Sequence, residues 1–163
     1  MVWGKRNAAI EVFMTNERER QTYYGAVNLF SHTFHLKEFP AGNGECTVEY
    51  LRWLKSLYPN KRTILLWDGA SYHRDVNVKT FLAEANDGRD EKDWQFLCLS
   101  FAPNAPDQNP VEDIWLKAKN HLRKNFAHNK TFASVKDCFC SFLRDLRFES
   151  VKFDWYTPNP QIS

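Results

Sequence analysis

The feature that most constrains the fold is a short apolar run, Thr63–Trp67, which is followed directly by Asp68 and Gly69. An unbroken run of this length is typical of a strand that is covered on both faces of a sheet. Segments with the apolar spacing of helices lie before and after it, over residues 47–57 and 76–85. We therefore expect an α/β layer built around this strand.

Further strands and helices are expected on both sides of this central segment. Residues 7–39 read as extended, and a turn at residues 28–32 indicates a hairpin. Asn109 and Pro110 have the residue types of an N-cap and a first helical position, and they follow a proline-rich loop. Strands are predicted over residues 21–30, 33–39 and 94–100, a helix from Asn109 with Ile114, Ala118, Leu122 and Phe126 as its apolar stripe, and a last helix over residues 132–148.

Length and composition are those of one globular domain. The chain has 163 residues, of which 43% are hydrophobic and 26% charged, enough for one buried core. It lacks an apolar stretch of membrane-spanning length and a signal segment at the N-terminus, so a cytoplasmic location and no membrane partner are expected. The cysteines lack zinc-type spacing and are expected to be reduced, partly buried thiols; they are Cys46, Cys98, Cys138 and Cys140.

The net charge of +2 is unevenly distributed along the chain. No acidic residue occurs between Ile114 and Lys136, whereas six basic residues do. Such a segment is compatible with a surface that faces phosphates, and equally with the solvated side of a helix. The basic residues are Lys117, Lys119, Arg123, Lys124, Lys130 and Lys136.

Two carboxylates, Asp68 and Glu112, are the candidates for chemistry. Asp68 stands where a buried strand ends, which is where open α/β sheets hold ligands, although an aspartate before Gly69 also fits a turn. Glu112 follows Asn109 by three residues, the spacing of a capping box that needs no other function. Two carboxylates from different elements would also suit two-metal phosphoryl chemistry with magnesium or manganese.

Two motifs around these carboxylates resemble those of mariner-like and related bacterial insertion-sequence transposases, which are DDE endonucleases. Residues 66–73, LWDGASYH, resemble the second-aspartate motif of this family, and residues 102–115, APNAPDQNPVEDIW, resemble its proline-rich glutamate motif. Lys119 follows at the expected place, and 43 residues separate Asp68 from Glu112, a spacing that the family tolerates. The resemblance extends from about Trp3 to at least residue 139.

The resemblance implies an RNase H-like mixed sheet flanked by helices, and DNA transposition as the function. It implies that Asp68 and Glu112 are catalytic and hold Mg²⁺ or Mn²⁺, while Asn109 and Pro110 fix where the helix begins. Transposon ends and target DNA are then the expected partners. The residues expected to contact DNA are the helix residues Lys117, Lys119, Arg123 and Lys124, together with His73. His73 matches a family position near the scissile phosphate, and it fits equally a helix-start histidine that bonds backbone or water.

The sequence also departs from the family pattern. Gly69 stands where the family usually has Asn, and the loop has Asn104 and Ala105 in place of the usual Tyr-Ser. The family's first catalytic aspartate precedes the segment that matches residues 2–6, and no carboxylate stands there in this sequence. Residues 1–150 are therefore expected to be a truncated catalytic domain without the first central strand, with an incomplete two-metal site, followed by a loose tail over residues 151–163.

Three possibilities follow for the sheet, and three hypotheses follow for the activity. Without its first strand, either residues 7–14 move inward, or the sheet opens, or another chain supplies the strand. The first functional hypothesis is a transposase-derived catalytic fragment that cleaves DNA weakly or not at all. The alternatives are a non-catalytic remnant that binds DNA or pairs with itself or an intact transposase, and a nuclease in which Glu11 replaces the missing ligand.

Overall fold

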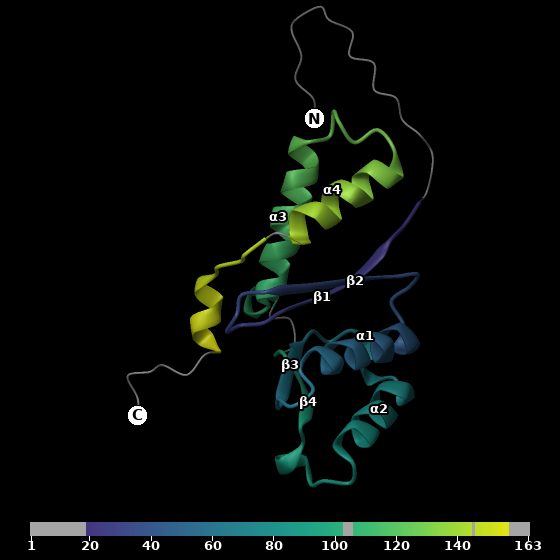
Figure 1. Cartoon of the computed structure of the whole chain (residues 1–163), viewed down its shortest axis with the longest axis vertical. Coiled ribbons are helices and arrows are strands. Elements are labelled where there is room, and N and C mark those ends of the chain that lie inside the picture. The colour runs from purple at the N-terminus through teal and green to yellow at the C-terminus, as the bar shows by residue number, and fades with distance from the viewer. Residues whose placement is uncertain (1–18, 103–105, 145, 157–163) are drawn as a thin grey trace, which may run out of the picture.

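The computed structural model describes residues 19–102, 106–144 and 146–156, and the elements that these residues form are shown in Figure 1. The strands are β1 (Thr22–Val27), β2 (Phe34–Phe39), β3 (Thr63–Trp67) and β4 (Phe96–Ser100). The α-helices are α1 (Gly44–Leu57), α2 (Val76–Asn86), α3 (Pro110–Lys124) and α4 (Phe132–Arg144). Short 3-10 helices are η1 (Ser71–Arg74), η2 (Glu91–Asp93), η3 (Pro106–Gln108) and η4 (Val151–Trp155).

Strands β1 and β2 form the expected hairpin. They pair antiparallel, with Thr22 opposite Phe39 and Val27 opposite Phe34. The side chain of Asn28 forms the turn, since its Oδ1 accepts hydrogen bonds from the backbone N–H groups of Phe30 and Ser31 at 2.9 and 3.0 Å. The prediction of a hairpin is confirmed, with strands a few residues shorter than the pattern indicated.

The second sheet is the parallel pair β3 and β4, with Thr63 opposite Phe96 and Trp67 opposite Ser100. Helix α2 lies in the connection between the two strands, as parallel pairing requires. β1 is paired only with β2 and β3 only with β4, so the described residues form two separate two-stranded sheets. The α/β class is confirmed.

The hairpin lies between α3 and α4 on one side and α1 on the other, as Figure 1 shows. Alternate residues of each strand face the two sides, as the two-residue period of a strand requires. Phe34 and Leu36 pack in the cluster with α3 and α4, whereas Phe39 packs against α1. The cluster on the α3–α4 side is built around Phe34, Ile114, Ala118, Leu143, Phe148 and Phe153.

The β3–β4 sheet is covered on one face only. Its inner face packs on α1 and α2 through Leu51, Val78, Phe81 and Phe96. On the other face, Ile64 is 54% exposed and Leu99 is 42% exposed. The prediction that Thr63–Trp67 is covered on both faces is therefore wrong, because α3 and α4 pack on the hairpin rather than on this sheet.

A buried amide joins α2 to β4. Asn86 is fully buried, and its Nδ2 donates to the carbonyl oxygens of Leu82 and Phe96 at 2.7 and 2.9 Å. Its Oδ1 accepts from the backbone N–H groups of Gln95 and Phe96 at 2.8 and 3.0 Å. The side chain is thus buried with both its amide groups hydrogen-bonded, which fixes the end of α2 against the start of β4.

The ends of the last two helices differ from their predictions. α3 ends at Lys124, so Phe126 lies outside the helix and is 66% exposed, and the apolar stripe includes only the earlier positions. α4 ends at Arg144 instead of continuing to residue 148. Phe148 is nevertheless buried, because the chain after α4 turns back over α3.

The segment after Ser150 also packs on the domain. Phe153 of η4 is buried, Lys152 Nζ lies 2.9 Å from Asp113 Oδ1, and Tyr156 Oη donates to the carbonyl oxygen of Gln108 at 2.8 Å. The loose tail expected over residues 151–163 therefore does not begin at residue 151. Residues 157–163 lie outside the described part of the chain.

The four cysteines are free thiols, as expected, and Cys46 is buried. Within the described ranges, no helix has both the length and the apolar character needed to cross a bilayer.

Candidate active site

A cavity of about 670 Å³ separates the two sheets. Its walls include residues 23–27 of β1 on one side and residues 63–67 of β3 on the other. Asp68, His73 and Glu112 also line it, so the structure brings both candidate carboxylates to one cavity. The cavity runs along β3 and includes its carboxyl end, the usual location of ligand sites in open α/β sheets.

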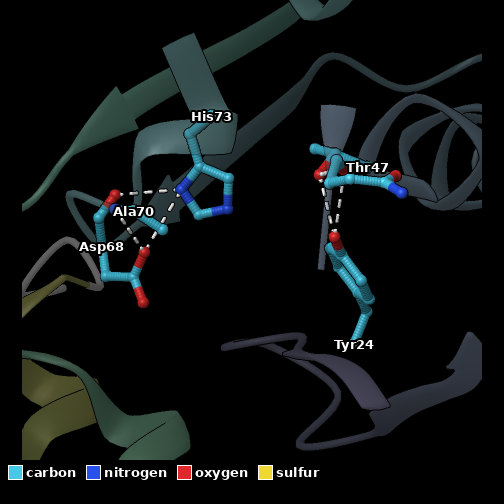
Figure 2. Close-up of polar contacts among 6 residues, drawn as sticks. Tyr24, Thr47, Asp68, Ala70 and His73 are labelled. Atoms are coloured by element: carbon cyan, nitrogen blue, oxygen red, sulfur yellow. Dashed lines mark hydrogen bonds and ion pairs between the residues drawn. The ribbon is translucent and has the colours of Figure 1, made fainter. Parts of the chain in front are cut away.

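Asp68 follows the last residue of β3, and its side chain is 57% exposed. Its Oδ1 accepts a hydrogen bond from the backbone N–H of Ala70 at 3.0 Å, which is the turn that an aspartate before Gly69 favours. Figure 2 shows His73 beside the same residue, with Nδ1 lying 3.2 Å from Oδ1 and 3.1 Å from the Asp68 carbonyl oxygen. Among the described residues, none bonds to Oδ2, so this oxygen is open to a ligand.

His73 is held mainly by packing. Its ring stacks on Trp67 with centroids 4.2 Å apart and planes 3° from parallel, and its side chain is 12% exposed. Burial lowers the pKa of His73 below 6.5, although the carbonyl and the charge of Asp68 act in the opposite direction. The ring is therefore neutral near pH 7, and a proton on Nδ1 would be donated to Asp68. The structure thus gives His73 a contact that orients Asp68.

Glu112 occupies the third helical position of α3, immediately after Pro110 and Val111. Asn109 caps the helix, since its Oδ1 accepts from the Val111 N–H at 3.0 Å. The predicted capping box is only half formed. The exposed carboxylate of Glu112 makes no hydrogen bond or ion pair within the described residues, and it lines the cavity instead. Asn109 and Pro110 therefore set the helix start while the glutamate stays available.

Two tyrosines that the sequence analysis did not single out also line the cavity. Tyr24 Oη lies 3.0 Å from Thr47 Oγ1, which fixes the ring of β1 against α1 (Figure 2). The Tyr24 and Tyr72 rings are 6.2 Å apart. The pKa of Tyr72 is raised by burial first and then by the negative charge of Asp68, so its phenol remains protonated. Tyr72 belongs to the 66–73 motif, whereas no sequence signal marks Tyr24.

The basic residues of α3 do not share one surface. Helical spacing places Lys119 and Arg123 in line with Glu112, at positions i+7 and i+11. Lys117 and Lys124 lie on another flank, and Lys117 Nζ sits over the ring of Phe148, 4.2 Å from its centroid. The predicted set of DNA contacts thus divides into a pair that continues from the glutamate, Lys119 and Arg123, and a pair on another flank, of which Lys117 lies against the C-terminal segment.

The donor set of the cavity suits a hard cation only in part. Carboxylate oxygens are the ligands that Mg²⁺ and Mn²⁺ prefer, and Asp68 and Glu112 present such oxygens to the cavity. The described residues contain no group of three or more His, Cys, Asp or Glu side chains placed to hold a metal ion. Glu11, the hypothetical third ligand, lies outside the described residues.

Comparison with known proteins agrees with the sequence motifs. Residues 2–133 match the family described as DDE superfamily endonuclease. Among solved structures, the chain is similar to the Mos1 transposase in its paired-end complex with left transposon end, with a TM-score of 0.53 and 17% identity. That match covers 96% of this chain and 44% of the Mos1 chain, so this chain spans less than half of the solved protein and shares its fold. No curated protein matches the chain.

Proposed function

The chain belongs to the DDE superfamily endonucleases, and on that premise we propose that it carries two metal-binding carboxylates of a DNA transposase centre. The observation that carries the proposal is that Asp68 and Glu112, from a strand end and a helix start, line one cavity with unpaired carboxylate oxygens. The proposed fold is RNase H-like, with β1–β2 and β3–β4 as the two parts of one mixed sheet. The proposed substrates are transposon ends and target DNA.

In this proposal, Asp68 Oδ2 and the Glu112 carboxylate would hold Mg²⁺ or Mn²⁺. The chemistry that such an ion would supply when bound is activation of an attacking water or 3′ hydroxyl and stabilisation of the leaving oxygen. His73 orients Asp68 by contacting its Oδ1 and its carbonyl oxygen. The half-formed cap leaves Glu112 free to face the ion, because Asn109 alone satisfies the helix start.

With these two ligands alone, we expect little or no strand cleavage. Two-metal catalysis depends on a fixed coordination geometry, and the described residues supply only two carboxylates to the cavity. The proposed function of the described part is therefore metal and DNA binding, with cleavage requiring a further ligand.

Calorimetric titration of the whole chain with Mn²⁺ tests the metal site. Asp68→Asn and Glu112→Gln should each weaken Mn²⁺ binding by at least about tenfold, because each removes a charged ligand. Asp90→Asn is the matched control, since Asp90 is 81% exposed and does not line the cavity. Equal affinities in Asp68→Asn and Asp90→Asn would sink the proposal.

The DNA surface is proposed to run along Lys119 and Arg123, which are exposed and continue from Glu112 along α3. Each phosphate contact changes the salt slope of DNA binding by about 0.9. The double variant Lys119→Gln/Arg123→Gln should therefore lower the slope by about 2 in binding assays on duplex DNA. Lys117→Gln is the control and should lower the slope less, because its ammonium is placed over Phe148.

The second candidate function is a non-catalytic remnant that pairs with an intact transposase or with itself. The uncovered face of the β3–β4 sheet favours it, since Ile64 and Leu99 are 54% and 42% exposed there. Sedimentation with an intact DDE transposase, with and without EDTA, separates the two. Two results together would favour the remnant. The complex would form in EDTA, and Asp68→Asn would leave Mn²⁺ binding unchanged.

A further inference from the structure

The turn between α3 and α4, residues 125–131, exposes an aromatic ring. Phe126 comes shortly after Lys124, the last residue of α3, and is 66% exposed. The turn has a defined conformation, since the Asn125 N–H donates to the carbonyl oxygen of His121 at 3.1 Å. The Asn129 N–H likewise donates to the Phe126 carbonyl oxygen at 3.2 Å. A single exposed apolar ring is ordinary on a protein surface, so the meaning of Phe126 depends on the charges around it.

The charged side chains along this turn are basic. Arg123 and Lys124 immediately precede it, and Lys130 lies within it. All three cations are exposed, and none forms an ion pair with a described residue. The sequence contains no acidic residue from Ile114 to Lys136. The turn therefore presents uncompensated positive charge around Phe126, which is complementary to phosphates.

The start of α4 indicates that part of this charge serves binding rather than stability. Cations at the end of α3 interact favourably with the negative end of its dipole, which accounts for Arg123 and Lys124 without a ligand. Lys130 instead precedes α4, whose N-terminus is the positive end of the dipole and whose first turn has no acidic residue. A cation there is unfavourable for the helix alone, but together with the helix N-terminus it provides a place for a phosphate.

We propose that the α3–α4 turn is a second contact for duplex DNA, in which Phe126 inserts at a base-pair step and the three cations hold the flanking phosphates. Apolar side chains flanked by cations unstack base steps and bend the duplex in this way. Lysines are depleted at the centres of protein interfaces, so the charges favour DNA over a protein as the partner. The inference rests on the proposed function, because it extends the DNA surface along Lys119 and Arg123 to the end of α3.

The length of α3 sets the distance between this contact and the candidate active site. The helix extends about 18 Å from Glu112 to Lys124, at about 1.5 Å per residue. Successive base pairs of B-form DNA are about 3.4 Å apart, so the turn reaches about five base pairs from a strand held at Glu112. Figure 1 shows the turn at the end of α3 that points away from β3 and β4. One duplex lying along α3 therefore reaches both places.

Binding of the whole chain to a labelled duplex at several salt concentrations tests the two parts of the contact. Phe126→Ala should weaken binding by at least about fivefold and leave the salt slope unchanged, because a stacked ring displaces no counterion. Lys124→Gln/Lys130→Gln should lower the slope by about 2. Phe126→Trp should keep the wild-type affinity, since an aromatic face is retained. Trp155→Ala is the matched control and should bind normally, because Trp155 is 59% exposed on η4 beside Asp154.

Insertion itself is measured with duplexes that carry 2-aminopurine at a TA step, a step that unstacks readily. This base fluoresces more strongly when it is unstacked. The wild-type chain should raise the fluorescence on binding, whereas Phe126→Ala, at a saturating concentration, should not. No rise with the wild-type chain, or the same rise with both, would overturn the proposal.

The outcomes separate this inference from the proposed function. If Phe126→Ala binds as tightly as the wild-type chain while Lys119→Gln/Arg123→Gln lowers the salt slope, the inference fails and the proposed DNA surface stands. If the whole chain binds no duplex, both are refuted. Should Phe126→Ala reduce self-association in sedimentation but leave DNA binding intact, the turn is a protein contact and the inference is wrong.

Discussion

The two halves of the molecule differ in how their sheets are covered. The β1–β2 hairpin has α1 on one face and α3 and α4 on the other, so its apolar side chains are enclosed on both sides. The β3–β4 sheet has helices on one face only and leaves Ile64 and Leu99 partly exposed on the other. Asp68 belongs to this less covered half, whereas Glu112 belongs to the enclosed half. The candidate site therefore combines Glu112, from the half whose sheet is covered on both faces, with Asp68, from the half whose sheet is covered on one face.

Removing the same side chain from each half should give the largest contrast. Ile114→Ala, at a position with no exposed surface, should lower the free energy of unfolding by about 2–5 kcal/mol because it opens a cavity in the enclosed half. Ile64→Ala, at a position 54% exposed, should lower it by about 1 kcal/mol or less. Urea unfolding of both variants measures the difference. Similar losses at the two positions would mean that the β3–β4 face is covered in solution.

The less covered half is predicted to depend on one polar side chain. Asn86→Ala should lower the free energy of unfolding by about 2–4 kcal/mol, because it leaves the buried N–H and C=O of Phe96 without partners. Asn77→Ala, at an exposed position of the same helix, serves as the control and should have an effect within about 0.5 kcal/mol. If the two alanine variants unfold at the same urea concentration, the role assigned to Asn86 is wrong.

Substituting alanine for one glycine in each half compares the space available for a single added methyl group. At Gly25, an added Cβ would lie 2.7 Å from the Trp115 ring and even closer to Phe34, so Gly25→Ala should cost about 1–3 kcal/mol through overpacking. At Gly69, nothing lies within 4 Å of an added Cβ, and Gly69→Ala should change stability by no more than about 0.5 kcal/mol. Thermal unfolding distinguishes the two outcomes. The same open space should admit Gly69→Asn, the residue that the family usually carries there.

The smallest expected effect concerns the pH dependence near the site. Burial lowers the pKa of His73 below 6.5, so the unfolded chain binds its proton more readily than the folded chain does. The stability that comes from neutral His73 is therefore complete above about pH 6.5 and decreases as the pH falls towards the lowered pKa.

His73→Gln should reduce the change in unfolding free energy between about pH 7.5 and pH 5, measured by urea unfolding. His35 is the comparison from the hairpin, because burial lowers its pKa in the same direction. His35→Gln should reduce a separate part of the profile, and the double variant should reduce both. A profile that steepens in His73→Gln would contradict the neutral, buried ring.

Local structure and the family could both be predicted from the sequence. The hairpin, the Thr63–Trp67 strand, the helix before it and the helix that begins after Asn109 all follow from short-range patterns and cap residues, and all are present. The family that the residues 66–73 and 102–115 indicated is the family that the chain belongs to. Such features depend on residues within a few positions of one another, so they can be predicted from a single sequence.

Other features of the site depended on contacts between distant segments. Only the tertiary structure could show that Glu112 leaves its capping box half formed, that Lys117 lies over Phe148, or that Asn86 joins α2 to β4. It also decided that the chain after residue 150 packs on α3 and that β3 has one uncovered face.

The physical reason is that propensity and periodicity determine how a segment can fold but not which surface it meets. The apolar stripe of the amphipathic α3 does not by itself specify which of the two sheets covers it. In the folded protein it packs on the β1–β2 hairpin. That choice left β3 with an open face and a cavity beside it. The sequence by itself therefore determined the elements and the family of this protein, while the packing of α3 and α4 decided the surroundings of Asp68 and Glu112.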